Sequence, residues 1–415
     1  TIDTTGKTVY SSSAYSNLYA SFKIKVRANL NYMDTGYLTY DANGGKNAPE
    51  KTSLTTNKVT SMKPTMDGKG FLGWATSSDA IVPDYKSGDA YSGVGRTLYA
   101  VWSDAKNVMV TSFPTTISDQ KANIKEVYFV NDTQSNIDTK YNSASIKADL
   151  TSSGSVKGWL EADANNSGKY ILYIGSYGAT YLTTAYNLFG NYTSLKKIDL
   201  SNVDTSSTTS MSSMFNDCSS LTTIDVSHFD TSNVKTMSLM FGKCSSLVNL
   251  DVSNFVTNQV TNLGGMFTNC SKLASIDVSR FDTSKVTDMN SIFNACSSLK
   301  SIDLSNFVTT NLTNMAYMFS NCSGLTSLDL SSFTTSKVTS MSYIFSGCKN
   351  ITVLNISSFD LSDSNTVLTR FGSMFNGMNS SCQVKVKDTN AQSWVLSAEN
   401  AHPTSWSTSN VLVQA

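Results

Sequence analysis

The stretch "MFNDCSSLTTIDVSHFDTSNVKT", residues 214–236, decides the fold because its pattern returns at a fixed interval. Phe215 stands three residues before Cys218, and Leu221 stands six residues after Phe215. The phenylalanine recurs every 26 residues through seven units, and an eighth unit follows a four-residue insertion near "SDSNTVLTR". A fixed period of this length indicates a repeat architecture, in which stacked units share one core. The eight phenylalanines are Phe189, Phe215, Phe241, Phe267, Phe293, Phe319, Phe345 and Phe375.

Each unit carries two hydrophobic periods in succession. Ile224 and Val226 alternate with polar residues, which is typical of a strand with one buried face. Val234, Met237 and Phe241 follow at steps of three and four, which is helical or 3₁₀ spacing. We therefore expect one strand, one turn and one short helix per unit. About eight such units predict a right-handed α/β solenoid of 26-residue coils.

The repeat resembles a known bacterial family. The stretch "LTTIDVSHFDTSNVKTMSLMFGKCSS" is similar to the 26-residue leucine-rich repeats of BspA-like bacterial surface proteins, and the resemblance covers residues 188–387. It implies a non-enzymatic protein that is extracellular, either secreted or attached to the bacterial cell surface. Members are often adhesins, so the resemblance also implies a protein partner, such as a host extracellular-matrix or cell-surface component.

A separate unit precedes the repeats at residues 37–104. Its motifs "YLTYDANGGKNAP", "GFLGW" and "TLYAVW" are similar to the Listeria–Bacteroides repeat, also called the internalin-type B repeat. That family implies a small β-grasp-like domain on a bacterial surface protein. The run Asn43-Gly44-Gly45 after an alternating strand predicts a hairpin. Trp74 and Trp102 are expected to anchor the small core.

The remaining segments are assigned by their position around the repeats. Solenoid ends expose core and need covers. We therefore assign residues 105–187 to an N-terminal cap and residues 388–415 to a C-terminal cap. Residues 1–36 contain one strand-like run, "SFKIKV", and stay unassigned. The chain starts at Thr1 without a methionine, so we expect a processed or truncated product.

Six regularly spaced cysteines could be metal ligands, disulfide partners, redox thiols or core material. Equivalent side chains of stacked coils point the same way, whereas a disulfide or a metal site needs them to converge. Tyr192 and Met378 take the cysteine position in the first and last units, as packing permits. We therefore interpret the six as a buried structural column, with Cys382 unexplained. The column is Cys218, Cys244, Cys270, Cys296, Cys322 and Cys348.

Between the two apolar residues of the expected strand, such as Ile224 and Val226, six successive units carry an aspartate. It is expected to point outward, which would align six carboxylates about 4.8 Å apart. Either hydrogen bonds from the serine two residues on and from backbone N–H groups offset their repulsion, or a cation such as Ca²⁺ or a basic partner does. This column is the candidate ligand-binding stripe of the concave face. It comprises Asp199, Asp225, Asp251, Asp277, Asp303 and Asp329.

Composition and charge disfavour several classes of partner and of activity. The formal charge is zero, with 31 basic and 31 acidic residues and no basic block, so nucleic acid and anionic membranes are poor partners. No stretch is apolar enough to predict membrane insertion. His228 occupies a variable surface position and His402 lies far from any nucleophile in sequence, so neither indicates catalysis. We expect no enzyme, no metal site and no cofactor.

Three functional hypotheses remain. The first is a cell-surface adhesin or ligand-binding protein that uses a rigid repeat scaffold. The second is a passive surface stalk without a specific ligand. The third is an enzyme, which the missing nucleophile–base pair and metal motif disfavour. The sequence leaves the ligand, calcium dependence, oligomeric state and mode of wall attachment open.

Overall fold

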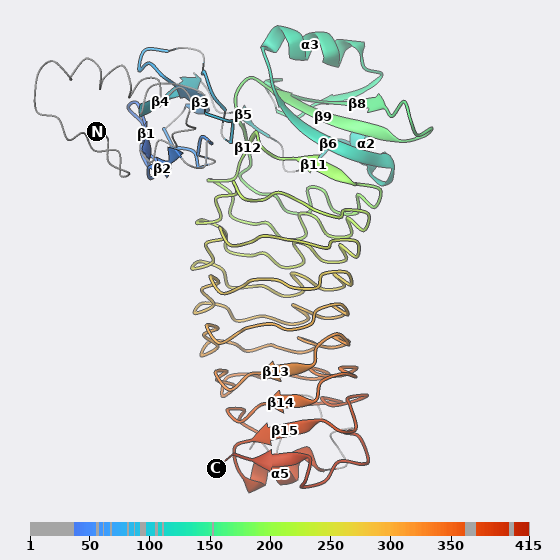
Figure 1. Cartoon of the computed structure of the whole chain (residues 1–415). Helices are drawn as coiled ribbons and strands as arrows, with labels where there is room; N and C mark the ends of the chain where they lie inside the picture. The colour runs from blue at the N-terminus through green and yellow to red at the C-terminus, as the bar shows by residue number, and fades with distance from the viewer. Residues whose placement is uncertain are drawn as a thin grey trace, which may run out of the picture.

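The computed structural model describes residues 37–54, 58–60, 62–66, 69–80, 83–86, 88–91, 97–103, 107–109, 112–151, 153–361, 371–397 and 402–414. Residues 1–36 and the whole stretch "SDSNTVLTR", residues 362–370, lie outside this set, so their assignments stay predictions. Figure 1 shows a long stack of coils with a small domain and a twisted sheet at one end and a short helix at the other.

The small domain, residues 37–103, is built on a four-stranded sheet. Its strands are β1 (Tyr37–Asp41), β2 (Thr52–Ser53), β3 (Gly70–Ala75) and β4 (Thr97–Ser103), in the order β2-β1-β4-β3. β1 pairs parallel with β4 and antiparallel with β2, while β3 pairs antiparallel with β4. Leu38, Trp74 and Leu98 are buried in its core.

The Asn43-Gly44-Gly45 turn differs from the tight hairpin that the sequence predicts. It does reverse the chain, with φ of 47° at Asn43 and 88° at Gly44. However, β1 ends at Asp41 and its antiparallel partner β2 begins only at Thr52. Gly45 is needed there because an added Cβ would lie 2.5 Å from the Trp102 ring and 2.6 Å from the Thr65 carbonyl oxygen.

A five-stranded sheet covers the upper end of the coils (Figure 1). Its order is β11-β6-β9-β8-β7, and its edge strand β11 already belongs to the first coil. The parallel register of Ile198 with Val127 therefore continues the coil into the sheet and leaves no free edge between them. The strands are β6 (Ile124–Asn131), β7 (Ile146–Asp149), β8 (Val156–Ala162), β9 (Tyr170–Ser176) and β11 (Lys197–Asp199).

Short elements complete this end. A second sheet has the order β12-β10-β5, with β5 (Asn107–Val108), β10 (Thr180–Tyr181) and β12 (Val203–Asp204). The helices are α2 (Thr115–Ser118), the 3₁₀ turn η2 (Lys121–Asn123) and α3 (Gln134–Ser143). The Thr133 hydroxyl caps α3 by accepting from the Asn136 N–H.

The coil stack, residues 188–361 and 371–386, repeats its contacts every 26 residues. Ser210, Thr236 and Asn262 form parallel bridges one to the next, and the same series runs on to Ser340. The rings of the phenylalanine column from Phe189 to Phe375 stack at 5.7–6.3 Å between centroids and at no more than 17° between planes. The buried apolar columns form one continuous core from the upper sheet to the C-terminal cover.

The short helix expected in each coil is not formed. Residues 205–326 contain turns, bends and bridges but neither a helix nor a strand. The reason is a pair of left-handed residues four positions apart in every coil, because a right-handed helix cannot continue through positive φ. The pairs are Asn187/Asn191, Ser213/Asp217, Leu239/Lys243, Gly265/Asn269, Ser291/Ala295, Tyr317/Asn321, Tyr343/Gly347 and Ser373/Gly377. That the coil stack is a right-handed leucine-rich-repeat solenoid stays a proposal.

The lower end is covered by a strand and a helix. The last sheet has the order β13-β14-β15-β16, with β13 (Ser327–Asp329), β14 (Val353–Asn355), β15 (Gln383–Val386) and β16 (Val411–Val413). Helix α5 (Thr389–Val395) begins after Asp388, whose side chain accepts from the Ala391 N–H. Trp394 packs against Phe371, and Trp406 packs against Phe375.

Candidate ligand-binding face

The six aspartates lie in one column along the coil stack. Five of them are exposed, and Asp199 is half-buried. In each coil the carboxylate Oδ1 accepts a hydrogen bond from the backbone N–H of the serine two residues on, at 2.9–3.0 Å. The internal hydrogen bonding that the sequence suggested is therefore present. Asn355 continues the column in the next coil with the same contact to the Ser357 N–H, at 3.2 Å.

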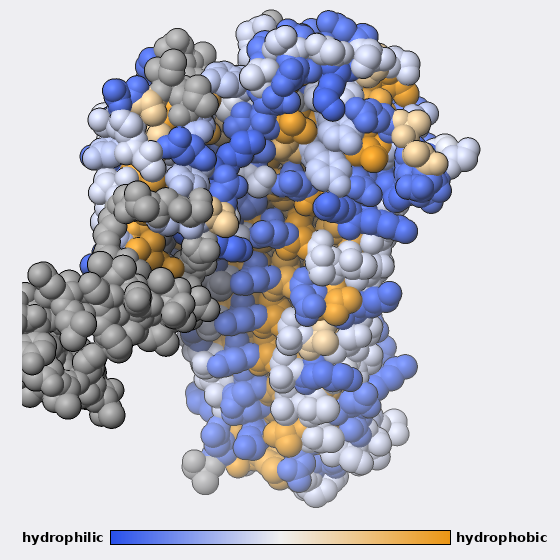
Figure 2. Space-filling model, turned by 45° about the horizontal axis from the view of Figure 1, so that its top comes forward, coloured by the Kyte–Doolittle hydropathy of each residue, from blue (hydrophilic) through white to orange (hydrophobic). Residues whose placement is uncertain are grey.

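These hydrogen bonds lower the pKa of five aspartates of the column and so favour their ionised form: Asp225, Asp251, Asp277, Asp303 and Asp329. Bonds from Ser253 lower the pKa of Asp251, and they prevail over the neighbouring carboxylates Asp277 and Asp225, which raise it. The pKa of Asp277 is lowered in the same way by Ser279. Figure 2 shows polar side chains beside an apolar stripe along the coil stack. The aspartate column thus presents carboxylates that are held in place by backbone hydrogen bonds.

The cysteines form a different, internal column. All seven are free and buried. In six of them the thiol donates to the carbonyl oxygen of the phenylalanine 29 residues earlier, at 3.0–3.2 Å. Burial raises the pKa of Cys244 to about 12, so its thiolate is strongly disfavoured. Cys382 is also buried, and its thiol lies 3.7 Å from the carbonyl oxygen of Gln383.

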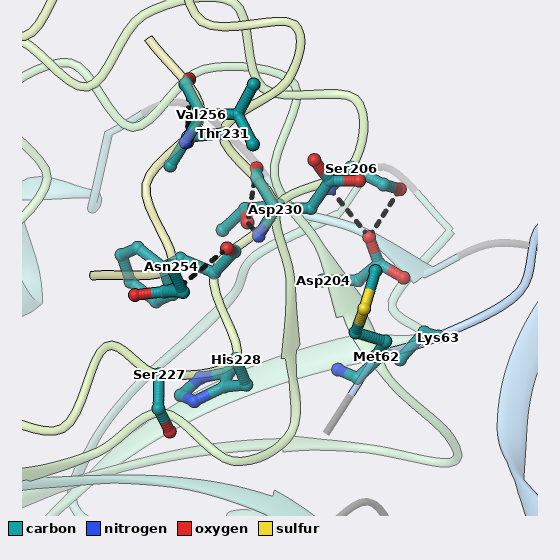
Figure 3. Close-up of a pocket in the computed structure, with 12 residues that line it drawn as sticks. Met62, Lys63, Asp204, Ser206, Ser227, His228, Asp230, Thr231, Asn254 and Val256 are labelled. Carbon is teal, nitrogen blue, oxygen red and sulfur yellow. Dashed lines mark hydrogen bonds between the residues drawn. The ribbon is translucent and has the colours of Figure 1, made fainter. Parts of the chain in front are cut away.

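The structure adds a feature that the sequence did not reveal, a corner where the small domain meets the first coils. The Lys63 amine donates to the Val203 carbonyl oxygen at 2.7 Å. A cavity of about 120 Å³ lies there, with Met62 and Lys63 from the small domain and Asp204 and His228 from the coils (Figure 3). We call this place the docking corner.

Burial controls the charges at the docking corner. It lowers the pKa of Lys63, which the nearby Asp204 carboxylate partly counteracts. Burial, followed by the charge of Lys63, lowers the pKa of His228 to about 4. Among the described residues the His228 Nε2 atom has no hydrogen-bond partner. His228 is therefore an interface residue that stays neutral near pH 7, in contrast to the variable surface position predicted from the sequence.

The docking corner also reaches the aspartate column. A second cavity, of about 540 Å³, is lined by Lys58 and Lys86 of the small domain and by Asp225 and His228 of the coils. Asp225, the second member of the column, thus lies in a cleft of mixed charge. The only sequence signal was a histidine at a position where neighbouring coils carry Asn202 and Asn254, and that signal does not indicate a domain contact.

Two kinds of feature are absent from the described ranges. No three or more His, Cys, Asp or Glu side chains there come together in a way that could hold a metal ion. In the same part of the chain no helix combines the length and the apolar character that crossing a membrane requires.

Two family models match the chain. The one described as "Mycoplasma protein of unknown function, DUF285" matches residues 164–277 and 263–394, which together span more than half of the sequence. The Listeria–Bacteroides repeat domain matches residues 37–101. Both families are typical of bacterial surface proteins. No curated protein and no solved structure was found to match the chain.

Proposed function

The chain belongs to this DUF285 family, and from that premise we propose that it is a bacterial cell-surface adhesin or ligand-binding protein whose coil stack binds another protein. The partner is a host extracellular-matrix or cell-surface protein, and the chain performs no catalysis. The carboxylate column is the observation that carries the proposal. It holds exposed, ionised groups in a fixed row, which suits a partner with a complementary basic surface.

Rigidity supports the choice of the coil face. Each carboxylate of the column is fixed by its own backbone hydrogen bond, and each coil is bonded to the next. A partner that binds there does not need to order the aspartates, so less conformational entropy is lost on binding. Small polar side chains flank the column, including Thr223, Asn249 and Ser275, and they leave the carboxylates accessible.

The test compares two sets of aspartates with the same local geometry. Asp251, Asp277 and Asp303 are changed to asparagine, which keeps the Oδ1 acceptor but removes the charge. We expect saturable binding to immobilised host matrix proteins by the unmodified chain, and at least about tenfold weaker binding by the triple variant.

The control uses two aspartates at another position of the repeat, where the coil between them carries Val256. Asp230 and Asp282 accept from the Ser232 and Ser284 N–H groups at 2.9 and 3.0 Å, so their change to asparagine tests general charge loss. Binding should survive in this control. Equal loss in both variants, or no saturable binding by the unmodified chain, would instead favour a passive stalk. Reproducible turnover in a hydrolase screen would overturn the non-enzymatic assignment.

A further inference from the structure

One position of the repeat ties each coil to the structure before it. Asn254 donates to the carbonyl oxygens of Val226 and Phe229 in the preceding coil, both at 3.0 Å. Asn306 donates to the equivalent Phe281 carbonyl oxygen at 3.2 Å. We call this the tie position, and its seven members are Asn202, His228, Asn254, Arg280, Asn306, Ser332 and Ser358.

The tie is broken at Arg280. Asn202, Ser332 and Ser358 each donate to a carbonyl oxygen of the preceding strand or coil, at 2.7, 3.5 and 3.0 Å. Within the described ranges, the exposed Arg280 guanidinium has neither a hydrogen bond nor an ion pair. The Phe255 carbonyl oxygen, which an asparagine at position 280 would be placed to bond, accepts no hydrogen bond from any described residue.

His228, the other residue at the tie position that is neither asparagine nor serine, shows what fills such a break. It leaves the Val203 carbonyl oxygen without an asparagine donor, and there the Lys63 amine of the small domain donates at 2.7 Å. The first break is therefore filled by a docked domain. In the part of the chain that the structure describes, nothing fills the second break, at Arg280.

The carboxylates near Arg280 in sequence are held by their own coil. Asp277, three residues earlier, accepts from the Ser279 N–H at 2.9 Å, and Asp282, two residues later, accepts from the Ser284 N–H at 3.0 Å. Neither carboxylate forms an ion pair with the guanidinium. The positive charge of Arg280 thus stays free for a group from outside the described chain.

Exposed apolar side chains lie on the turns before and after the Arg280 turn. The Thr283 hydroxyl donates to the Val308 carbonyl oxygen at 3.0 Å, which holds the Arg280 turn against the next one. Val308 is 43% exposed, and Val256 on the preceding turn is 44% exposed. Arginine is a frequent anchor residue of protein interfaces, whose centres are poor in other charged residues. An unpaired arginine between exposed valines therefore suits a protein contact.

The aspartate column does not by itself define where along the stack a partner binds. Its members repeat once per coil, so a basic partner could shift by one coil and meet the same charges. Arg280 is the one cation at the tie position, and it therefore makes its coil different from the others.

We propose that Arg280 binds a carboxylate of the partner protein and so fixes the register of that protein on the aspartate column. The guanidinium presents its N–H donors in a fork that matches a carboxylate, which adds geometric specificity to the attraction. The partner surface is then basic, to meet the column, with one acidic side chain set among its basic groups. This inference rests on the proposed function, because it defines the charge pattern of the same partner.

The experiment uses the full chain and two peptide probes. Both alternate glycine with lysine, so that in an extended peptide the charged side chains lie on one face. One carries a central glutamate, and its twin carries glutamine there. Calorimetric titration at low ionic strength should show at least about threefold tighter binding of the glutamate peptide, although its net positive charge is lower by one.

The outcomes separate this inference from the proposed function. Equal or weaker binding of the glutamate peptide would overturn the role of Arg280. If the glutamine peptide still binds and the triple variant of Asp251, Asp277 and Asp303 loses that binding, the proposed function stands without it. Absence of saturable binding for both peptides would count against the column and against Arg280 together.

Arg280→Asn tests the position directly. It should remove the preference for the glutamate peptide without lowering the melting temperature, because Asn254 and Asn306 occupy the equivalent position and the new amide would be placed to bond the Phe255 carbonyl oxygen. A lower melting temperature would show that Arg280 serves the packing of the coils, and would contradict the proposal.

The matched control is Lys272→Ser, which removes one exposed positive charge eight residues before Arg280. Ser246 and Ser298 occupy the equivalent position in the neighbouring coils, so the fold should tolerate the change. The preference for the glutamate peptide should remain in this variant. Its loss in both Lys272→Ser and Arg280→Asn would show that net charge decides, and would contradict a specific role for Arg280.

Discussion

The coil stack and the docking corner are held together in opposite ways. In the stack, Phe267 sits between Phe241 and Phe293 in contacts that the neighbouring coils repeat. At the docking corner, Lys63 and His228 make contacts that occur nowhere else in the described chain. Because the contacts of the stack repeat, the period of the sequence predicts them. Single contacts between distant segments do not leave such a signal.

The largest expected effect comes from breaking the stack. Phe267→Ala removes a fully buried ring from the stacked column, so we expect the free energy of unfolding to fall by about 3–5 kcal/mol in urea titrations. The control is Ser275→Ala, a change at an exposed position. It should alter the free energy of unfolding by no more than about 0.5 kcal/mol. A loss below about 1 kcal/mol for Phe267→Ala would contradict the idea of one shared core.

A smaller and more local effect is expected at the docking corner. Lys63→Ala removes the donor to the Val203 carbonyl and should weaken domain docking by about 1–3 kcal/mol. Hydrogen–deuterium exchange should rise in residues 69–80 while the coils from residue 257 onward stay protected. Lys51→Ala, which removes an exposed amine over the Tyr37 ring, is the control. Unchanged exchange in Lys63→Ala would refute a docking role for this bond.

A lower pH should weaken the contact between the small domain and the coils at the docking corner. His228 has a folded pKa of about 4, below the ordinary value of 6.5, so the undocked state binds more protons between these pH values. Docking should therefore weaken as the pH falls from 6.5 towards 4, although Asp225 and Asp199 oppose the effect.

His228→Asn should remove this part of the pH dependence, because Asn202 and Asn254 occupy the equivalent position in neighbouring coils. Protease susceptibility of the small domain at pH 7 and pH 4.5 measures the effect. His402→Gln, at the far end of the chain, should leave the pH dependence as it is. Persistence of the full pH dependence in His228→Asn would show that another group is responsible.

The aspartate column should give the smallest stability effect. The folded pKa values of Asp251, Asp277 and Asp303 are lowered, so their contribution is present above the unfolded pKa of about 3.9 and is lost as the pH falls through the folded values. The triple asparagine variant should have a flatter profile of melting temperature between pH 5 and pH 2. An unchanged slope would mean that these hydrogen bonds add nothing to stability.

The period of the sequence was sufficient to place the core columns. The phenylalanine at position 241 and the thiol at position 244 are buried, while Asp251 is exposed, as expected from alternation and spacing. The turn conformation was not predictable, because positive φ falls on Leu239 and Tyr317, which carry no glycine-like signal. The spacing of three and four that suggested a helix arises instead from successive turns.

The functional regions were only partly visible in the sequence. The aspartate column and its serine partners were read correctly as neighbours, because they are two residues apart in one coil. The docking corner joins Lys63 to Val203, which are 140 residues apart, and one sequence alone does not reveal such a contact.

The most direct test of the stacked arrangement is to delete one complete coil, residues 257–282, and measure native thiol reactivity. We expect the six remaining cysteines to stay unreactive towards a thiol reagent until urea is added, because the new junction restores the same contacts. Deletion of half a coil, residues 257–269, should expose thiols at once. Rapid labelling of the chain that lacks one complete coil would contradict the claim that its coils are interchangeable units of one core.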